Sequence, residues 1–204
     1  MVIILEEHSK IHNKKKKIIE KYNSSSQFYD KRYRVIQEEK YEIVLNNYRA
    51  DGRIILDLGC GTGLFFEYIK KSLLHKEAIK LNYVGVDISW KMLLEFKSKI
   101  INFNYSNYTP NLILSDIDCL PFRENIFFSI FALTSFQNLP HTKDGINESF
   151  RVSKNNADFK FSILKKKLEL ESLLKILKTK IKDLYIINNE NLEDIVIQGI
   201  ILKE

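Results

Sequence analysis

A short apolar run from Ile54 to Leu58 leads directly into three glycines on alternate positions, Gly59, Gly61 and Gly63. An apolar run of this length that ends at glycine predicts a buried strand entering a tight turn. Thr62 is a favoured helix N-cap residue, and an amphipathic segment follows it. The sequence therefore predicts a strand, a glycine turn and a helix, which is the arrangement that places a ligand at the carboxyl end of a parallel sheet.

The spacing of the glycines restricts the ligand. A dinucleotide-binding turn requires G-x-G-x-x-G, but residues 59–63 read G-x-G-x-G, and Leu64 stands where the last glycine would be. The phosphate-binding P-loop pattern is absent as well, because no lysine follows Gly63. The strand instead carries the carboxylate of Asp57, which repels phosphate but suits a cation. The resulting D-x-G-x-G-x-G pattern resembles motif I of the class I S-adenosylmethionine-dependent methyltransferases.

This resemblance implies that the turn surrounds the methionine part of the cofactor S-adenosylmethionine. Asp57 would serve the amino-acid end of the cofactor, and Gly59 and Gly61 would give it room. Cys60 and Gly63 belong to the same turn and are also expected at the cofactor site. The alternative is a chance glycine turn in another kind of α/β protein.

Two further apolar runs also end in carboxylates. One ends at Asp87, followed by Ile88, and the next ends at Asp116, followed by Ile117. An acid at the end of the second strand is placed to accept hydrogen bonds from the ribose hydroxyls of a nucleoside. In the resembled family the third acid lies near the adenine amino group, and Ile117 would stack on the ring. One strand-terminal Asp is more often a turn residue, but three in succession favour a cofactor site.

A fourth apolar run, Ile126 to Leu133, ends in the polar residues Thr134, Ser135 and Gln137. This strand end faces the methyl-transfer site in the resembled fold, so these residues are candidate contacts, and Thr134 is assigned to the cofactor. A polar loop after a core strand is the alternative. The family usually has an acid near the start of this strand, where Ser129 or a neighbour stands here. The [DN]-P-P-[FYW] signature of adenine- and glutamine-methylating enzymes is absent, which disfavours those substrates.

The segment before the first strand is predicted to form two helices, Ile11 to Tyr22 and Val35 to Tyr48, with a serine-rich loop between them. Tyr29 and Asp30 in this loop resemble the Y-D element that precedes the first strand in methyltransferases of the ubiquinone-biosynthesis type. Residues 1–50 would then form a helical lid, with Tyr29 closing over the cofactor. The alternative is that Tyr29 only packs the front helix onto the sheet.

Alternation of strands and helices along the chain predicts an α/β, doubly wound, Rossmann-like sheet. The resemblance implies seven mostly parallel strands in the order 3-2-1-4-5-7-6, with the last strand antiparallel. A helix and three further strands are expected at Lys143 to Lys154, Ala157 to Leu164, Leu184 to Asn188 and Ile195 to Leu202. The 204 residues suit a single domain, 1–204, made of the lid segment 1–50 and a core over 51–204.

The chain has a net charge of +6, and its lysines cluster at 14–17, at 165–167 and in a later predicted helix that includes Lys175 and Lys182. A basic face suits a polyanion such as RNA, although a lysine run is more often a solvated helix face. Two cysteines give neither a disulfide framework nor a zinc spacing, and no metal site is expected. A short apolar N-terminus and the lack of long apolar runs predict a cytoplasmic protein with no membrane segment.

These features predict a methyltransferase that transfers the methyl group by in-line displacement, a reaction helped mainly by positioning. The acceptor, a small metabolite, RNA or protein, stays open, and no residue is assigned as catalytic, His141 included. One alternative is a catalytically silent methyltransferase-like subunit that works with a partner. An aminopropyltransferase is another, but no acidic polyamine pocket supports it. The aromatic, asparagine-rich stretch Phe103 to Tyr108 precedes a predicted edge strand, where an activator subunit is a further hypothesis.

Overall fold

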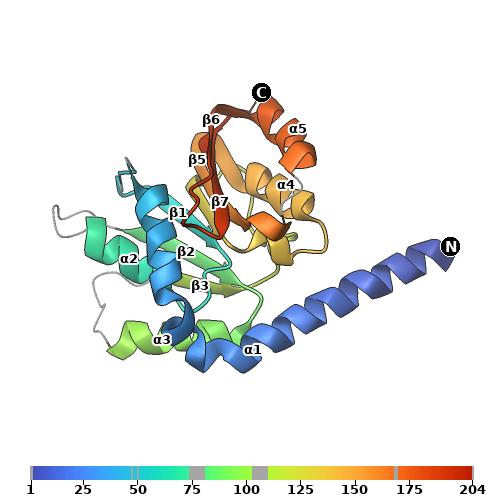
Figure 1. The fold of residues 1–204 in the computed structure, drawn as a ribbon, viewed down its shortest axis with the longest axis horizontal. Helices are drawn as coiled ribbons and strands as arrows, with labels where there is room; N and C mark the ends of the chain where they lie inside the picture. Colours follow the sequence, from blue (N-terminus) through green and yellow to red (C-terminus); the bar gives the residue numbers. More distant parts are fainter. Residues whose placement is uncertain are drawn as a thin grey trace.

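The computed structural model describes residues 2–46, 48–49, 51–73, 81–102, 110–167 and 170–203. These residues form a seven-stranded sheet in the order β3-β2-β1-β4-β5-β7-β6 (Figure 1). The strands are β1 (Ile54–Leu58), β2 (Asn82–Asp87), β3 (Asn111–Leu114), β4 (Phe127–Leu133), β5 (Ser153–Leu164), β6 (Ile181–Ile187) and β7 (Asp194–Ile201). Only β7 runs antiparallel to its neighbours, β5 and β6. The predicted fold class and strand order are confirmed.

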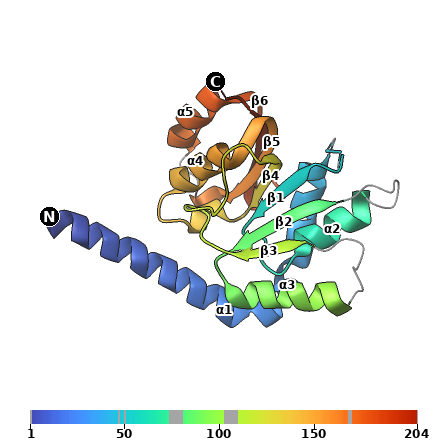
Figure 2. The same cartoon turned by 180° about the vertical axis from the view of Figure 1, so that it is seen from behind.

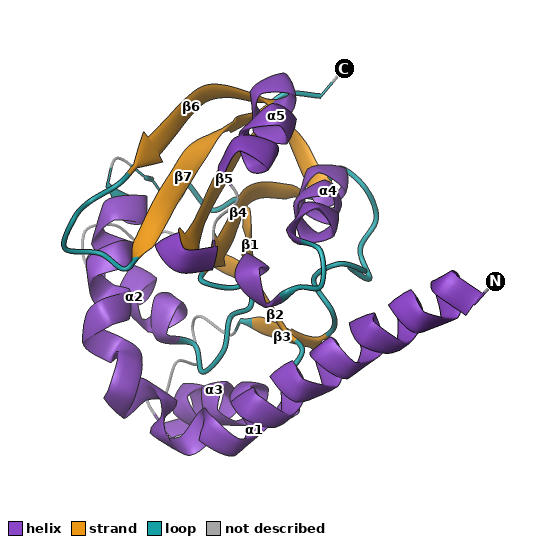
Figure 3. Ribbon diagram, turned by 45° about the vertical axis from the view of Figure 1, so that its right-hand side comes forward, coloured by secondary structure: helices purple, strands orange, loops and turns teal. Residues whose placement is uncertain are grey.

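Helices cover both faces of the sheet (Figures 2 and 3). On one face lie α1 (Val2–Leu45), α2 (Leu64–Leu73) and α3 (Trp90–Asn102), and on the other lie α4 (Thr142–Val152) and α5 (Leu170–Lys180). Two short 3-10 helices, η1 (Phe136–Asn138) and η2 (Lys165–Lys167), follow β4 and β5. Each face has its own buried apolar cluster, because successive residues of a strand point to opposite faces. In β1, Leu56 and Leu58 enter one cluster and Ile55 enters the other.

The parallel strands β1, β2, β3 and β4 all end at the same edge of the sheet. Their central members read as continuous apolar runs because helices bury them on both sides, as is typical of parallel sheets. The strand-terminal residues Asp87 and Thr134, which are far apart in the sequence, therefore come to lie near the glycine turn that follows β1.

The prediction of two front helices joined by a loop was wrong, because α1 runs without interruption from Val2 to Leu45. The serines that suggested a loop bond to the helix itself: Ser24 and Ser25 hydroxyls donate to the carbonyl of Lys21, at 2.9 and 3.0 Å. Back-bonding serines of this kind bend a helix rather than end it. The ribbon indeed changes direction about halfway along α1, so its N-terminal end extends beyond the rest of the molecule while its second half packs on the sheet (Figure 1).

Several element boundaries also differ from the sequence expectation. Lys182 was assigned to the last helix, but α5 ends at Lys180 and Lys182 lies in β6, where it pairs with Ile200 of β7. The fifth strand begins at Ser153, four residues earlier than predicted, because its first residue pairs with β4. None of the described helices combines the length and apolar character needed to cross a membrane.

Candidate functional site

The glycine turn after β1 is fixed by hydrogen bonds to β2. The Gly59 N–H donates to the carbonyl of Val86 at 2.8 Å, and the Gly61 N–H donates to Oδ2 of Asp87 at 2.9 Å. Gly59 has a φ of +78°, and a Cβ at this position would lie 2.6 Å from the Cβ of Ser135. Only glycine combines this backbone conformation with such a close approach, so the turn brings β1, β2 and the loop after β4 together.

A cavity lies against this turn, at the carboxyl ends of the parallel strands. It encloses about 680 Å³ of empty space, counting the part that is open to solvent. Eight of the eleven residues predicted from the sequence line it: Tyr29, Gly59, Gly61, Asp87, Ile88, Asp116, Ile117 and Thr134. The sequence pattern and the geometry therefore indicate the same place.

Asp87 is the buried carboxylate of this cavity. Its Oδ1 accepts from the Ser89 N–H at 2.7 Å and its Oδ2 from the Gly61 N–H. Burial raises the pKa of Asp87 to about 6, although these N–H bonds favour the charged form. A carboxylate has about four lone-pair sites, so acceptor capacity remains for the hydroxyls of a ligand.

The other three predicted residues lie elsewhere. Asp57 and Cys60 line a second, smaller cavity beneath the turn rather than the main one. Asp57 is fully buried and accepts a hydrogen bond from the hydroxyl of Tyr83. Gly63 lines neither cavity, and a Cβ there would collide with the ring of Phe96. The structure thus places Gly63 where it allows α2 to pack against α3.

Replacing Asp57 with Asn is expected to remove a pH dependence of stability. Burial raises the pKa of Asp57 to about 7, from an ordinary value of 3.8. Between about pH 4 and 7 the folded protein therefore holds a proton that the unfolded chain has lost. The stability that this group contributes is present at low pH and is lost as the pH rises through about 7. Asn keeps an acceptor oxygen for Tyr83 but does not titrate.

Urea unfolding of both proteins between about pH 5 and 8 checks this expectation. The free energy of unfolding of the wild type, measured relative to Asp57→Asn, should fall by at most about 1.4 kcal/mol per pH unit. A difference that stays constant over this range would show that Asp57 is ionised throughout in the folded protein.

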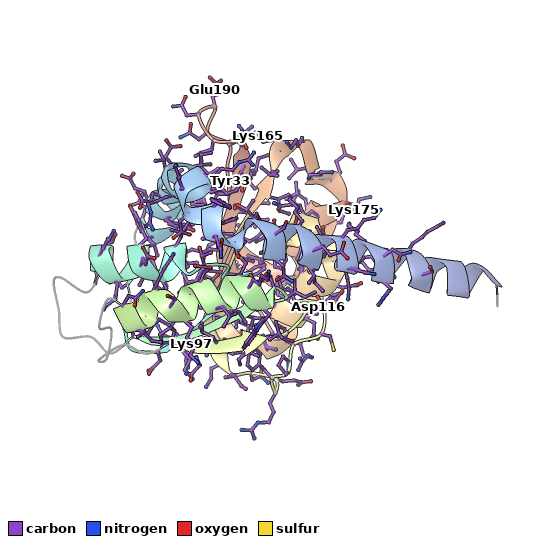
Figure 4. The ribbon with its side chains drawn as sticks, turned by 90° about the horizontal axis from the view of Figure 1, so that it is seen from below. Tyr33, Lys97, Asp116, Lys165, Lys175 and Glu190 are labelled. Carbon is purple, nitrogen blue, oxygen red and sulfur yellow. The ribbon has the colours of Figure 1, made fainter. Side chains whose placement is uncertain are left out.

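The structure adds residues of α1 that the sequence interpretation missed. Lys15, Ile18 and Tyr22 line the main cavity together with Tyr29. Their helical spacing was a readable signal, but the loop assumed around Tyr29 concealed it. Lys15 Nζ contacts Oδ2 of Asp116 at 2.7 Å, so the first half of α1 lies over this strand end, and Figure 4 shows Asp116 beside α1.

Two lysines of the run at 14–17 make contacts within the molecule. Lys14 Nζ donates to the carbonyl of Leu139 at 2.5 Å, and Lys15 also contacts Asp118 at 2.8 Å. These two lysines hold the first half of α1 to the loops after β3 and β4, which reduces the cationic surface they offer to a polyanion.

Thr134 lines the cavity and belongs to a buried polar network. Its φ is +60°. Its Oγ1 accepts a hydrogen bond from Lys40 Nζ at 2.6 Å and donates one to Oδ2 of Asp194 at 2.9 Å. Burial lowers the pKa of Lys40, and Asp194 opposes this effect. The next residue, Ser135, lines the cavity, and its buried Oγ has no hydrogen-bond partner among the described residues. Gln137 instead donates to the carbonyl of Thr134 at 2.8 Å.

The model of a family described as "Methyltransferase domain" matches residues 55–156, which are half of the chain. A ubiquinone/menaquinone biosynthesis C-methyltransferase of Wigglesworthia glossinidia brevipalpis is 34% identical over 102 residues, covering 49% of this chain and 38% of that protein. The chain spans 38–53% of the length of the first curated relatives it matches.

Two solved structures share the fold. A magnesium protoporphyrin IX methyltransferase of Synechocystis, with bound S-adenosylmethionine, has a TM-score of 0.72 at 16% identity, over 92% of this chain and 96% of that one. A Haloferax volcanii methyltransferase, in complex with the activator Trm112, has a TM-score of 0.66 at 11% identity, over 89% of this chain and 98% of that one. With the D-x-G-x-G-x-G turn and the strand order, the family match shows that the chain belongs to the class I S-adenosylmethionine-dependent methyltransferases.

Proposed function

We propose that the protein transfers the methyl group of S-adenosylmethionine to a small-molecule acceptor. One observation carries the proposal: the main cavity joins the glycine turn to a buried carboxylate at the end of β2 and to apolar side chains on either side of it. A Cβ at Gly61 would meet no atom within 4 Å, so this part of the turn borders open space that a ligand can fill.

The residues present fit the cofactor part by part. Asp87 keeps acceptor capacity for the two ribose hydroxyls. Ile88 and Ile117 offer apolar surface to the adenine ring, and Asp116, next to Ile117 in the chain, lines the same cavity. The glycine turn and Asp57 beneath it would serve the methionine end.

When bound, the cofactor supplies a methyl group that is already activated by its sulfonium charge, so the chain has little covalent chemistry to perform. Its part is to hold the acceptor in line and to exclude water. Leu133, Leu139 and Pro140 line the cavity beside Tyr22 and Tyr29 and keep this side of it apolar. Burial raises the pKa of both tyrosines, so their hydroxyls stay protonated at neutral pH and orient a ligand rather than remove its proton.

Two features favour a small acceptor over RNA. The first half of α1 lines the cavity and is tied by Lys14 and Lys15 to the loops around it, which encloses the site on this side. The name of the Wigglesworthia relative also places that protein in the biosynthesis of a small molecule.

Transfer of tritium from methyl-labelled S-adenosylmethionine tests this proposal. The protein is incubated with separate metabolite, RNA and protein fractions of a native extract, and we expect label in the metabolite fraction only. Label in RNA or protein would assign another acceptor class. Cofactor binding without transfer to any fraction would favour the silent subunit that works with a partner.

We further propose that an activator subunit pairs with the free edge of β3. Among the described residues this strand pairs with β2 alone, and Leu114 on it is 53% exposed. The Haloferax neighbour was solved in complex with an activator, which supports such a partner here. The stretch Phe103 to Tyr108, on which the sequence hypothesis rested, lies outside the described residues.

Replacing Leu114 with proline is expected to abolish this pairing. The Ser115 N–H donates to the carbonyl of Asp87 in β2. Successive N–H groups along a strand point to opposite sides. The Ser115 N–H points to β2, so the Leu114 N–H points to the open edge, where proline is tolerated. A partner that co-purifies with the wild type in equal amounts should be lost from Leu114→Pro and kept by Leu114→Thr. Full activity of the isolated wild-type chain would contradict the need for an activator.

A further inference from the structure

The second cavity, beneath the glycine turn, contains a buried amide with an unused acceptor. Gln37 of α1 lines this cavity and is only 6% exposed. Its Nε2 donates to the hydroxyl of Tyr29 at 3.3 Å, but its Oε1 has no hydrogen-bond partner among the described residues. Buried polar atoms almost always have a partner, so an acceptor left free beside a cavity points to a ligand that donates to it.

The lining of this cavity indicates the charge of that donor. Asp57 of β1 contributes a carboxyl group to this cavity and does not line the main one. Among the described residues that line the second cavity there is no lysine or arginine. A carboxyl group and an amide oxygen without a cation suit a positively charged donor, such as an ammonium group.

The two cavities are neighbours, which allows one ligand to reach both. The main and the second cavity share four lining residues: Tyr29, Gly59, Gly61 and Leu133. A ligand whose nucleoside occupies the main cavity can therefore extend past the turn into the second one. The cofactor of the proposed function has such a shape, because its amino-acid tail extends from the nucleoside and carries an ammonium group.

We propose that Gln37 is a cofactor-binding residue whose Oε1 accepts a hydrogen bond from the ammonium group of the methionine end of S-adenosylmethionine. This inference rests on the proposed function. Helix α1 would then bind the amino-acid end of the cofactor through Gln37, in addition to lining the main cavity. Gln37 would act together with Asp57 and the glycine turn, which line the same cavity.

Calorimetric titration with two ligands tests the inference. S-adenosylhomocysteine carries the amino-acid tail, and 5′-methylthioadenosine has the same nucleoside without it. Gln37→Met keeps the length of the side chain but removes the acceptor oxygen. We expect it to weaken binding of S-adenosylhomocysteine roughly 10- to 100-fold, the loss of one hydrogen bond to a charged group. Binding of 5′-methylthioadenosine should stay within about twofold of the wild type.

Two further variants complete the test. Gln198→Met is the matched control, because Gln198 Oε1 is also buried without a partner among the described residues but lines neither cavity. It should leave both affinities unchanged. Gln37→Glu keeps an acceptor oxygen and should still bind S-adenosylhomocysteine more tightly than 5′-methylthioadenosine. This variant keeps the test decisive if Gln37→Met does not fold.

The outcomes separate this inference from the proposed function. Equal weakening of both ligands by Gln37→Met, no weakening of either, or loss of the preference in Gln37→Glu overturns the role of Gln37. A wild-type protein that binds neither ligand overturns the proposed function itself.

Discussion

Replacing Gly63 with alanine is expected to lower the free energy of unfolding by about 2–5 kcal/mol, through two separate effects. Gly63 has a φ of +81°, a conformation that costs an L-residue about 1–2 kcal/mol. The new Cβ would also lie 2.6 Å from Cγ of Phe96, whose ring is 1% exposed and held between α2 and β2. Overpacking of a tight core costs a further 1–3 kcal/mol, roughly. Urea denaturation measures the sum.

Gly61→Ala is the matched control for this prediction. Its φ of +55° carries a similar conformational cost, but the added Cβ meets nothing within 4 Å. We expect a loss of only about 1–2 kcal/mol, together with weaker cofactor binding because Gly61 borders both cavities. Equal destabilisation by the two variants would show that α2 and α3 can move apart at little cost.

Replacing Asp87 with alanine is expected to weaken binding of S-adenosylhomocysteine at least roughly 100-fold, because hydrogen bonds to a charged group contribute about 1.5–3 kcal/mol each. The variant loses the carboxylate offered to the ribose. It also loses the acceptor for the Gly61 N–H, which holds the glycine turn against β2. Calorimetric titration measures the affinity, and circular dichroism checks that the sheet is intact.

Asp118→Asn controls for the loss of a negative charge near the site. Asp118 contacts Lys15 in the first half of α1 and does not line the main cavity. The affinity of Asp118→Asn for S-adenosylhomocysteine should therefore stay within about threefold of that of the wild type. If Asp87→Ala bound the ligand as well as Asp118→Asn does, the ribose would lie elsewhere.

The strand-terminal part of the site was readable from the sequence because its signals are local. The glycines after β1 and the acids Asp87 and Asp116 each sit where an apolar run ends, and parallel strands bring such ends to one edge. Gly63 shows the limit of the pattern. It has the same spacing as Gly59 and Gly61, but it faces Phe96, a contact that depends on how α2 and α3 pack.

The contribution of α1 could not be read in the same way. Serine and asparagine favour loops, but the hydroxyls of Ser24 and Ser25 bond to a carbonyl of the preceding helical turn, so these residues remain within the helix. The unused oxygen of Gln37 likewise becomes visible only in three dimensions. The sequence shows a glutamine on a helix, whereas the structure shows a buried acceptor beside a cavity.

Titration of the wild-type protein with S-adenosylhomocysteine, alongside the dinucleotide NAD as a competitor for the same type of fold, tests the central claim most directly. The account predicts one molecule of S-adenosylhomocysteine bound per chain with micromolar affinity, and no binding of NAD. Binding of NAD without S-adenosylhomocysteine, or binding of neither at millimolar concentration, would contradict the assignment of the cavity to the methyl donor.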